Sequence, residues 1–128
     1  MTTSNPLLTH KSVLVVEDDA DSRYLYCEFV RLLGMKALEF PRYSAALESI
    51  KASRPDLALV ILDLSLPGMM AEEFVAELRA MEGYASTSFL ALSGRNDVSA
   101  RLENLRVDGF LKKPCDLDPL LREIERLA

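Results

Sequence analysis

Short apolar runs alternate along the chain with stretches in which apolar residues recur every three or four positions. The runs lie at residues 13–16, 36–40, 57–62, 89–92 and 109–111, and short runs with branched residues are typical of strands. The first and third runs are uninterrupted, as expected of strands buried on both faces, whereas 36–40 alternates and fits a sheet edge. The pattern therefore predicts five strands.

The stretches between the runs predict helices, because their apolar residues keep helical spacing. The positions that carry this pattern are Leu25, Phe29, Leu32 and Leu33 before Gly34, then Ala46, Leu47 and Ile50 before Pro55, then Phe74, Val75, Leu78 and Met81 near Gly83, then Val98, Leu102 and Leu105, and finally Leu117, Leu120, Leu121, Ile124 and Leu127. Asp116 or Asp118 is placed to cap the last helix, with Pro119 in its first turn. Short connections and right-handed crossovers turn this (βα)5 order into an α/β fold, a parallel sheet covered by helices on both faces.

Composition places this fold in one domain. The chain has 128 residues, of which 49% are hydrophobic and 27% charged, as in ordinary globular proteins. Residues 1–11, with His10, are polar and aperiodic, so we predict a loose tail there and a folded domain over 12–128. No apolar run approaches the ~20 residues that cross a bilayer, and no leader opens the chain, so we expect a soluble, cytoplasmic protein with no membrane partner.

Charge and cysteine usage exclude further classes. The 20 acidic and 15 basic residues give a net charge of −5 with no basic stripe, which argues against direct nucleic-acid binding. Cys27 and Cys115 lack metal-ligand spacing, and we expect both to be reduced bystanders.

Polar residues that could carry chemistry follow the predicted strands directly, where open α/β sheets bind their ligands. These residues are Glu17, Asp18 and Asp19, then Asp63, then Ser93 and Gly94, and then Lys112 and Lys113. Four of the 20 acidic residues lie at this edge, which accounts for nearly all of the net charge of −5.

Clustered carboxylates repel one another, and a hard divalent cation such as Mg²⁺ is their natural partner. With such an ion, a lone Asp opposite a Lys and a Ser hydroxyl is an arrangement for phosphoryl transfer. Each part also has a plain structural interpretation: residues 17–19 as a helix cap, Ser93 and Gly94 as a turn, and the lysine pair as solvated surface. Only their coincidence at one sheet edge favours a site.

Four stretches carry a family resemblance: VLVVEDD at 13–19, VILDLSLPG at 60–68, ALSG at 91–94 and GFLKKP at 109–114. Over residues 12–127 the sequence resembles the receiver domain of bacterial two-component response regulators. The resemblance implies a flavodoxin-like three-layer sandwich with its five parallel strands in the order 2-1-3-4-5. It also implies a role for each matched residue.

By that resemblance Asp63 is the phosphoacceptor, and Glu17 and Asp18 hold Mg²⁺ together with Asp63 and the backbone carbonyl of Ser65. Ser93 matches the switch hydroxyl, Gly94 supplies a backbone N–H to the phosphoryl group, and Lys113 is the lysine that contacts it. Phe110 matches the switch aromatic. Asp19 is an extra acid whose role could be limited to capping the first helix. The Lys113–Pro114 bond is expected to be cis.

The sequence departs from the family at three places. Phe110 has no hydroxyl where many members have Tyr, Met70 and Ala71 replace a common Asp-Gly or Asn-Gly pair, and the segment from Ser93 to Lys113 is about two residues short. These changes concern output and partner choice, since no catalytic group is lost.

The resemblance implies a single-domain response regulator. It would take a phosphoryl group from a sensor histidine kinase or a histidine phosphotransfer protein and then hydrolyse it, so that it catalyses only its own modification. Phosphorylation would switch the surface of the fourth helix, fifth strand and fifth helix toward a protein target, with a homodimer as a further candidate assembly.

Four alternatives stay open at this point. The chain could be a receiver from a hybrid kinase or larger regulator, or a phosphorylation-independent interaction module. A flavin- or nucleotide-binding protein would need a Gly-rich phosphate loop where EDDADS stands. A haloacid-dehalogenase-type phosphatase would need a second Asp where Ser65 stands.

Overall fold

The computed structural model describes residues 11–94 and 99–128, without the side chains of 99–101. Five parallel strands form one sheet in the order β2-β1-β3-β4-β5. The strands are β1 (Ser12–Val16), β2 (Lys36–Phe40), β3 (Leu57–Asp63), β4 (Ser88–Ser93) and β5 (Gly109–Lys112). The predicted fold is confirmed, with β2 at an edge and β3 in the centre.

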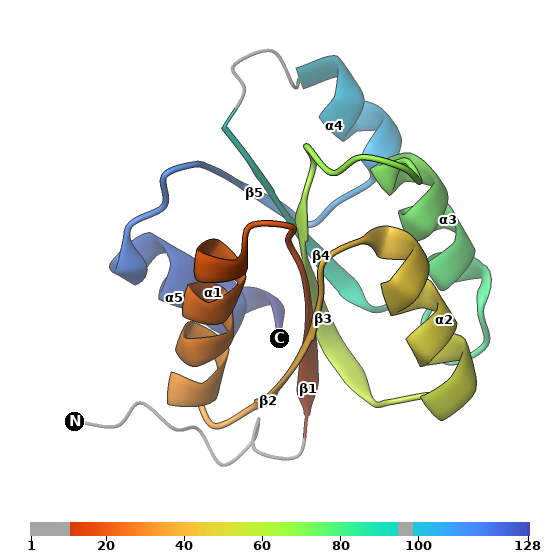
Figure 1. Cartoon of the computed structure of the whole chain (residues 1–128), viewed down its shortest axis with the longest axis horizontal. Coiled ribbons are helices and arrows are strands. Elements are labelled where there is room, and N and C mark those ends of the chain that lie inside the picture. The colour runs from red at the N-terminus through yellow and green to blue at the C-terminus, as the bar shows by residue number, and fades with distance from the viewer. Residues whose placement is uncertain (1–10, 95–98) are drawn as a thin grey trace.

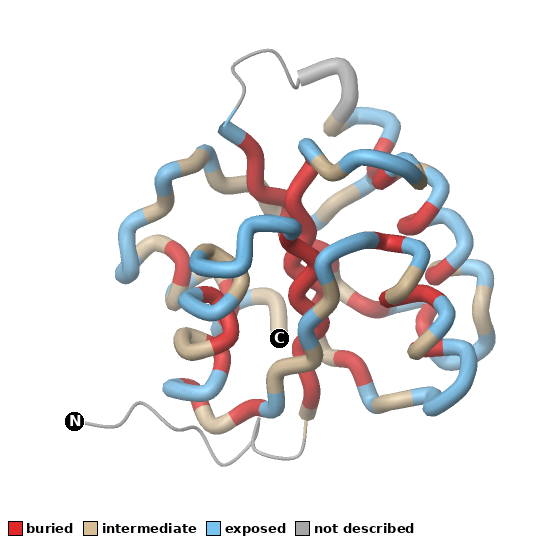
Figure 2. Tube along the Cα trace, viewed as in Figure 1, coloured by how far each residue is buried: buried red, intermediate tan, exposed pale blue. Residues whose placement is uncertain are grey.

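Helices cover both faces of the sheet (Figure 1). On one face lie α1 (Ala20–Leu32) and α5 (Leu117–Leu127), and on the other lie α2 (Tyr43–Ser53), α3 (Ala71–Ala80) and α4 (Ser99–Leu105). Each face has its own apolar core, and the strands β1, β3 and β4 between them are the most continuously buried part of the described chain (Figure 2). The central strands are therefore held on both sides, and their carboxyl ends are fixed in position.

One helix presents a different face from the one that its apolar spacing predicts. In α1 the leucines Leu25 and Leu32 are 47% and 45% exposed, whereas Tyr26, Cys27 and Val30 are buried. The helix carries two overlapping apolar stripes, and packing against β1 and α5 buries the one with Tyr26 and Val30. Spacing alone does not distinguish the two stripes, because both repeat every three or four residues.

The N-termini of α1 and α5 settle the role of Asp19 and the choice between Asp116 and Asp118 as a helix cap. Asp19 caps α1, and its side chain accepts a hydrogen bond of 2.9 Å from the amide of Ser22. Asp116, and not Asp118, is the N-cap residue of α5, although its side chain makes no capping bond. Asp19 therefore has a structural role at the start of α1, apart from the neighbouring acids.

Both cysteines are free thiols, as predicted, with Cys27 buried. None of the helices in the described ranges is long and apolar enough to cross a membrane. The predicted tail with His10, and Val98 of the fourth helical pattern, fall outside the described residues.

Candidate functional site

The chemistry-bearing residues gather at the carboxyl edge of the sheet because they lie at the ends of four of its five parallel strands. Glu17 follows β1, Asp63 is the last residue of β3, Ser93 is the last residue of β4, and Lys113 follows β5. In a parallel sheet these ends share one edge, so residues far apart in sequence become neighbours. The edge predicted from sequence is therefore assembled in the structure.

Three carboxylates form a cluster at this edge. One oxygen from each of Glu17, Asp18 and Asp63 lies within 4.8 Å of the other two. Glu17 and Asp63 are buried, whereas Asp18 is exposed to solvent. Oxygen donors on a half-open rim fit a hard cation such as Mg²⁺, which keeps several water ligands. The donor set therefore suits this ion, and Asp19 is not part of it.

Lys113 supplies the positive charge within the cluster. Its Nζ lies 2.5 Å from Oε1 of Glu17 and 3.3 Å from Oδ2 of Asp63. The bond from Lys113 to Pro114 is cis, as the resemblance implied. The ammonium group thus bridges the two buried acids, which is how two buried like charges can lie so close together.

Burial and the neighbouring charges together shift the pKa values of Glu17 and Lys113. Burial raises the pKa of Glu17 from 4.5 to about 7, against the lowering effect of its hydrogen bond to Lys113. Burial alone would lower the pKa of Lys113, but the hydrogen bond to Glu17 and the charges of Asp63 and Glu17 outweigh it, so that its pKa is raised. Lys113 therefore stays charged at neutral pH, while Glu17 titrates near it.

The loop after β3 closes around the carboxylate of Asp63. The amide of Ser65 donates to Oδ1 of Asp63 at 3.0 Å, and the Ser65 side chain is exposed. This contact brings Ser65 into the site through its main chain. Its carbonyl as a metal ligand stays a prediction.

Two of the remaining predicted residues, Ser93 and Gly94, lie beside Lys113. The amide of Lys113 donates to the carbonyl of Ser93 at 2.8 Å, and the Ser93 side chain is fully buried. Gly94 is exposed, and a Cβ at this position would lie 3.9 Å from the Cβ of Lys113. Phe110 is half-buried against the core beneath α2, α3 and α4. The structure thus brings together the residues assigned by resemblance, and their roles remain to be tested.

Two further residues hold the main chain of the site, and the sequence offered no signal for either. Nη1 of Arg23 donates to the carbonyl of Glu17 at 2.8 Å, and its Nε pairs with Glu39 at 3.1 Å. The hydroxyl of Tyr43 donates to the carbonyl of Asp63. Arg23 lies on α1, six residues after Glu17, whereas Tyr43 lies on α2, in a different βα unit from Asp63.

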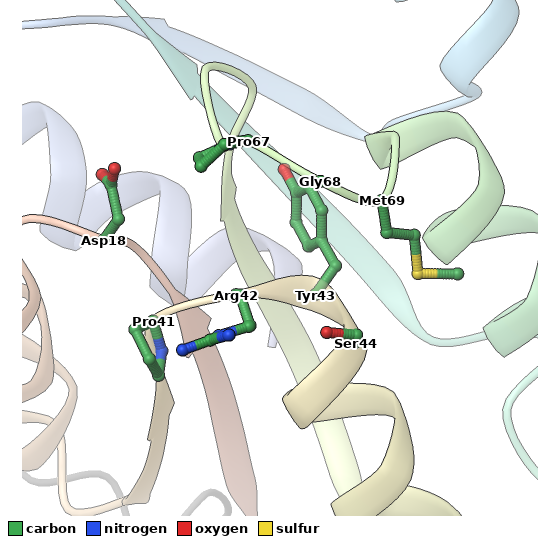
Figure 3. Close-up of a pocket in the computed structure, with 8 residues that line it drawn as sticks. All are labelled: Asp18, Pro41, Arg42, Tyr43, Ser44, Pro67, Gly68 and Met69. Carbon is green, nitrogen blue, oxygen red and sulfur yellow. The ribbon is translucent and has the colours of Figure 1, made fainter.

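A cavity of about 520 Å³ opens beside the acids, between the loops that follow β1, β2 and β3 (Figure 3). Its lining includes Asp18, Arg42, Tyr43 and Met69. The cluster is thus reached from solvent on its Asp18 side. Taken together, the edge places a buried carboxylate beside an ammonium group and two further acids that suit a hard cation, which are the groups that phosphoryl transfer to a carboxylate needs.

Similar proteins share this fold. In sequence, the chain is 26% identical over 117 residues to the phosphate regulon transcriptional regulatory protein PhoB of Escherichia coli (strain K12), a match that covers 90% of the chain and 50% of that regulator. The chain therefore spans about half the length of this relative. In structure, it resembles the chemotaxis response regulator CheY4 of Vibrio cholerae with a TM-score of 0.83 and 24% identity, over 94% of the chain and 100% of that structure.

It is also similar to the receiver domain of the sensor histidine kinase PA1611 of Pseudomonas aeruginosa PAO1, with a TM-score of 0.77 and 23% identity, over 91% of the chain and 96% of that structure. That structure has a magnesium ion coordinated in its active site cleft. The family model of the response regulator receiver domain matches residues 13–125, nearly the whole described chain. The chain therefore belongs to the response regulator receiver domain family of two-component signalling.

Proposed function

We propose that this receiver domain accepts a phosphoryl group on Asp63, in a Mg²⁺-dependent reaction, from a phosphohistidine of a sensor histidine kinase or a histidine phosphotransfer protein. The single observation that carries the proposal is the position of the Asp63 carboxylate. It lies within 4.8 Å of two further acids and 3.3 Å from Nζ of Lys113. A carboxylate with an ammonium group on one side, and on the other two acids that would hold a metal cation, is a nucleophile in a site suited to a phosphoryl group.

In the reaction a carboxylate oxygen of Asp63 forms the new P–O bond while the P–N bond to the donor imidazole breaks. The imidazole leaves with that electron pair and takes up a proton. Lys113 contacts the phosphoryl oxygens and offsets their charge, and the backbone N–H of Gly94 adds a hydrogen bond. Glu17, Asp18, Asp63 and the Ser65 carbonyl would hold Mg²⁺, which supplies further charge stabilisation when bound.

Hydrolysis of the acyl phosphate would return Asp63 to its starting state. Between the two reactions, the phosphoryl group would draw the Ser93 hydroxyl toward it and favour an inward position of Phe110. Ser93 pairs with Lys112 of β5, and Phe110 lies within β5, so the surface of α4, β5 and α5 would change with them. We propose that a protein target, or a second copy of the domain, reads that surface.

The magnesium ion in the active site cleft of the PA1611 receiver supports the choice of cation. The chemistry of the donors in this chain supports it independently, because the three grouped side chains are all carboxylates, without nitrogen or sulfur ligands.

The experiment is intact mass spectrometry after incubation with acetyl phosphate, with and without Mg²⁺. The parent should gain one phosphoryl group only with Mg²⁺, Asp63→Asn should gain none, and Asp56→Asn should behave like the parent. Asp56 is a suitable control because it is exposed and precedes β3 at the opposite edge of the sheet. An unmodified parent that also fails to bind beryllofluoride would indicate a phosphorylation-independent interaction module.

A further inference from the structure

Tyr43 is a buried tyrosine at the first position of α2, and it lies next to the acidic cluster. It is 1% exposed, and its ring stacks on Phe74 of α3 with centroids 5.0 Å apart and planes inclined by 23°. Figure 3 shows its hydroxyl directed toward the loop that contains Pro67 and Gly68. The ring is fixed by packing, so the hydroxyl has a defined position.

That hydroxyl donates to the main-chain carbonyl of Asp63. The N–H of the same peptide group belongs to Leu64, and it donates to the carbonyl of Leu92 on β4 at 3.0 Å. Both polar groups of the Asp63–Leu64 peptide are therefore held, one by a strand and the other by a side chain. A peptide plane held at both ends has a fixed orientation, and with it the direction of the Asp63 side chain.

The paired residues of β1 and β3 end at Val16 and Leu62, one residue before this carbonyl. Because Leu64 N–H points toward β4, the carbonyl of Asp63 points to the other side, toward β1. Strand β1 ends at Val16, which pairs with Leu62, and the next amide, that of Glu17, donates to Phe40 of β2. Asp63 is 4% exposed, so its carbonyl needs a donor from within the protein. Tyr43 supplies that donor.

We propose that Tyr43 is a positioning residue for the phosphoacceptor: its hydroxyl sets the Asp63–Leu64 peptide so that the Asp63 carboxylate meets both Ser65 N–H and Lys113. This inference rests on the proposed function of Asp63. Without the hydroxyl, the peptide can rotate about its remaining bond to Leu92, and the carboxylate loses its alignment for in-line attack. Small misplacements of a reacting group cost up to about 100-fold in rate.

The test compares Tyr43→Phe with Tyr84→Phe. Tyr84 is the matched control, because it is also buried and its hydroxyl donates to a main-chain carbonyl, that of Pro55, at 2.6 Å. It lies at the opposite edge of the sheet, between α3 and β4. Both substitutions keep the ring and remove one hydrogen bond, so both should lower the melting temperature. A purely structural role would make the two variants alike in every other respect.

At a temperature where all three proteins are folded by circular dichroism, we expect Tyr43→Phe to lower the maximal rate constant of phosphorylation by acetyl phosphate about 10-fold or more. The half-saturating acetyl phosphate concentration should stay within about twofold of the parent, whereas the dissociation constant of Mg²⁺ should rise, because Asp63 is also one of the proposed ligands of the ion. Tyr84→Phe should leave all three quantities unchanged. A Tyr43→Phe rate constant within twofold of the parent would overturn the proposal.

A second measurement does not depend on phosphorylation. In ¹H–¹⁵N spectra, the amide resonances of Leu64 and Ser65 report the peptide and the bond to the Asp63 carboxylate. We expect them to shift in Tyr43→Phe and to stay in place in Tyr84→Phe. If the parent takes no phosphoryl group, the proposed function fails, and these resonances decide the positioning role alone: unshifted signals in Tyr43→Phe refute it.

Discussion

The two edges of the sheet use the same local device in opposite electrostatic settings. At each edge a buried tyrosine donates to a main-chain carbonyl, Tyr43 to Asp63 at the carboxyl edge and Tyr84 to Pro55 at the amino edge. Beside Tyr84, the exposed Arg54 lies 5.4 Å from the ring centre and donates to the carbonyl of Glu82 at 2.7 Å. The amino edge thus satisfies its polar groups at the surface.

At the carboxyl edge, by contrast, two carboxylates are buried together and share one ammonium group. Buried like charges are unfavourable, and a hydrophobic or neutral replacement would hold the fold as well or better. Packing and hydrogen bonding explain the arrangement of the amino edge. The buried charges of the carboxyl edge are explained instead by the ligand that this edge would bind. Departures of this kind from stability are expected at functional sites.

The largest expected difference in stability between the two edges follows from removal of the Lys113 ammonium group, which the two buried acids share. In Mg²⁺-free buffer at pH 8, Lys113→Met should lower the free energy of unfolding by roughly 3–5 kcal/mol, because two buried carboxylates lose their partner. Lys51→Met is the control, since Lys51 forms an exposed pair with Glu77 at 3.9 Å, and it should cost below about 0.5 kcal/mol. Urea denaturation measures both, and equal losses would contradict the contrast between the edges.

The pH dependence of stability should have its origin at the carboxyl edge. Because the pKa of Glu17 is raised from 4.5 to about 7 in the fold, the native state holds an extra proton between these values. The contribution of Glu17 to the free energy of unfolding is therefore fully present below pH 4.5. It is lost as the pH rises through 7, and the loss reaches up to about 3 kcal/mol without Mg²⁺.

Urea midpoints between pH 4.5 and 8 measure this loss. Glu17→Gln should flatten the decline, and subtraction of the two curves cancels the single histidine. Identical slopes in parent and variant would show that Glu17 does not titrate in this range.

Relief of charge repulsion should have a smaller effect of opposite sign. Asp63→Asn should raise the free energy of unfolding of the metal-free protein by roughly 1–2 kcal/mol, because one of the clustered charges is removed. Mg²⁺ at ten times its dissociation constant should stabilise the parent by about 1.4 kcal/mol and the variant by less. Thermal melts with a Mg²⁺ titration test this; a parent that is indifferent to Mg²⁺ would show that the acids do not form one cation site.

The smallest effect is expected at the amino edge. Arg54→Met removes the contact with Glu82 and the cation over Tyr84, and it should cost about 0.5–1 kcal/mol. The loss should be the same at pH 5 and pH 8 and with or without Mg²⁺, because no buried acid is involved. A dependence on either condition would show that the two edges are coupled.

The sequence predicted what periodicity and strand order determine. The apolar runs located each strand to within about a residue, and the parallel topology then brought Glu17, Asp63, Ser93 and Lys113 to one edge. The predicted buried side of α1 was wrong in part: Leu33 is buried and Phe29 packs against the core, but Leu25 and Leu32 are exposed, although they repeat as regularly as Tyr26 and Val30. Which stripe is buried depends on packing with α5, a partner remote in sequence.

The main-chain contacts of Arg23 and Tyr43 could not be predicted for a related reason. Neither residue directly follows a strand. Tyr43 reaches a carbonyl of a different βα unit, and Arg23 reaches one of its own unit, six positions earlier. Their partners are peptide groups, which have no sequence signature. The roles of the acids, by contrast, came from matching motifs, since carboxylates after apolar strands are unusual enough to be recognised.

The pair between Glu17 and Lys113 joins residues 96 positions apart. Contacts of such separation close late in folding, because the entropy of a long loop must first be lost. A chain still being synthesised, or one whose fifth strand has detached, would carry Asp63 without its ammonium group. On the proposed function, a chain would then become able to accept a phosphoryl group only when its fold is complete, and incompletely folded chains would not respond.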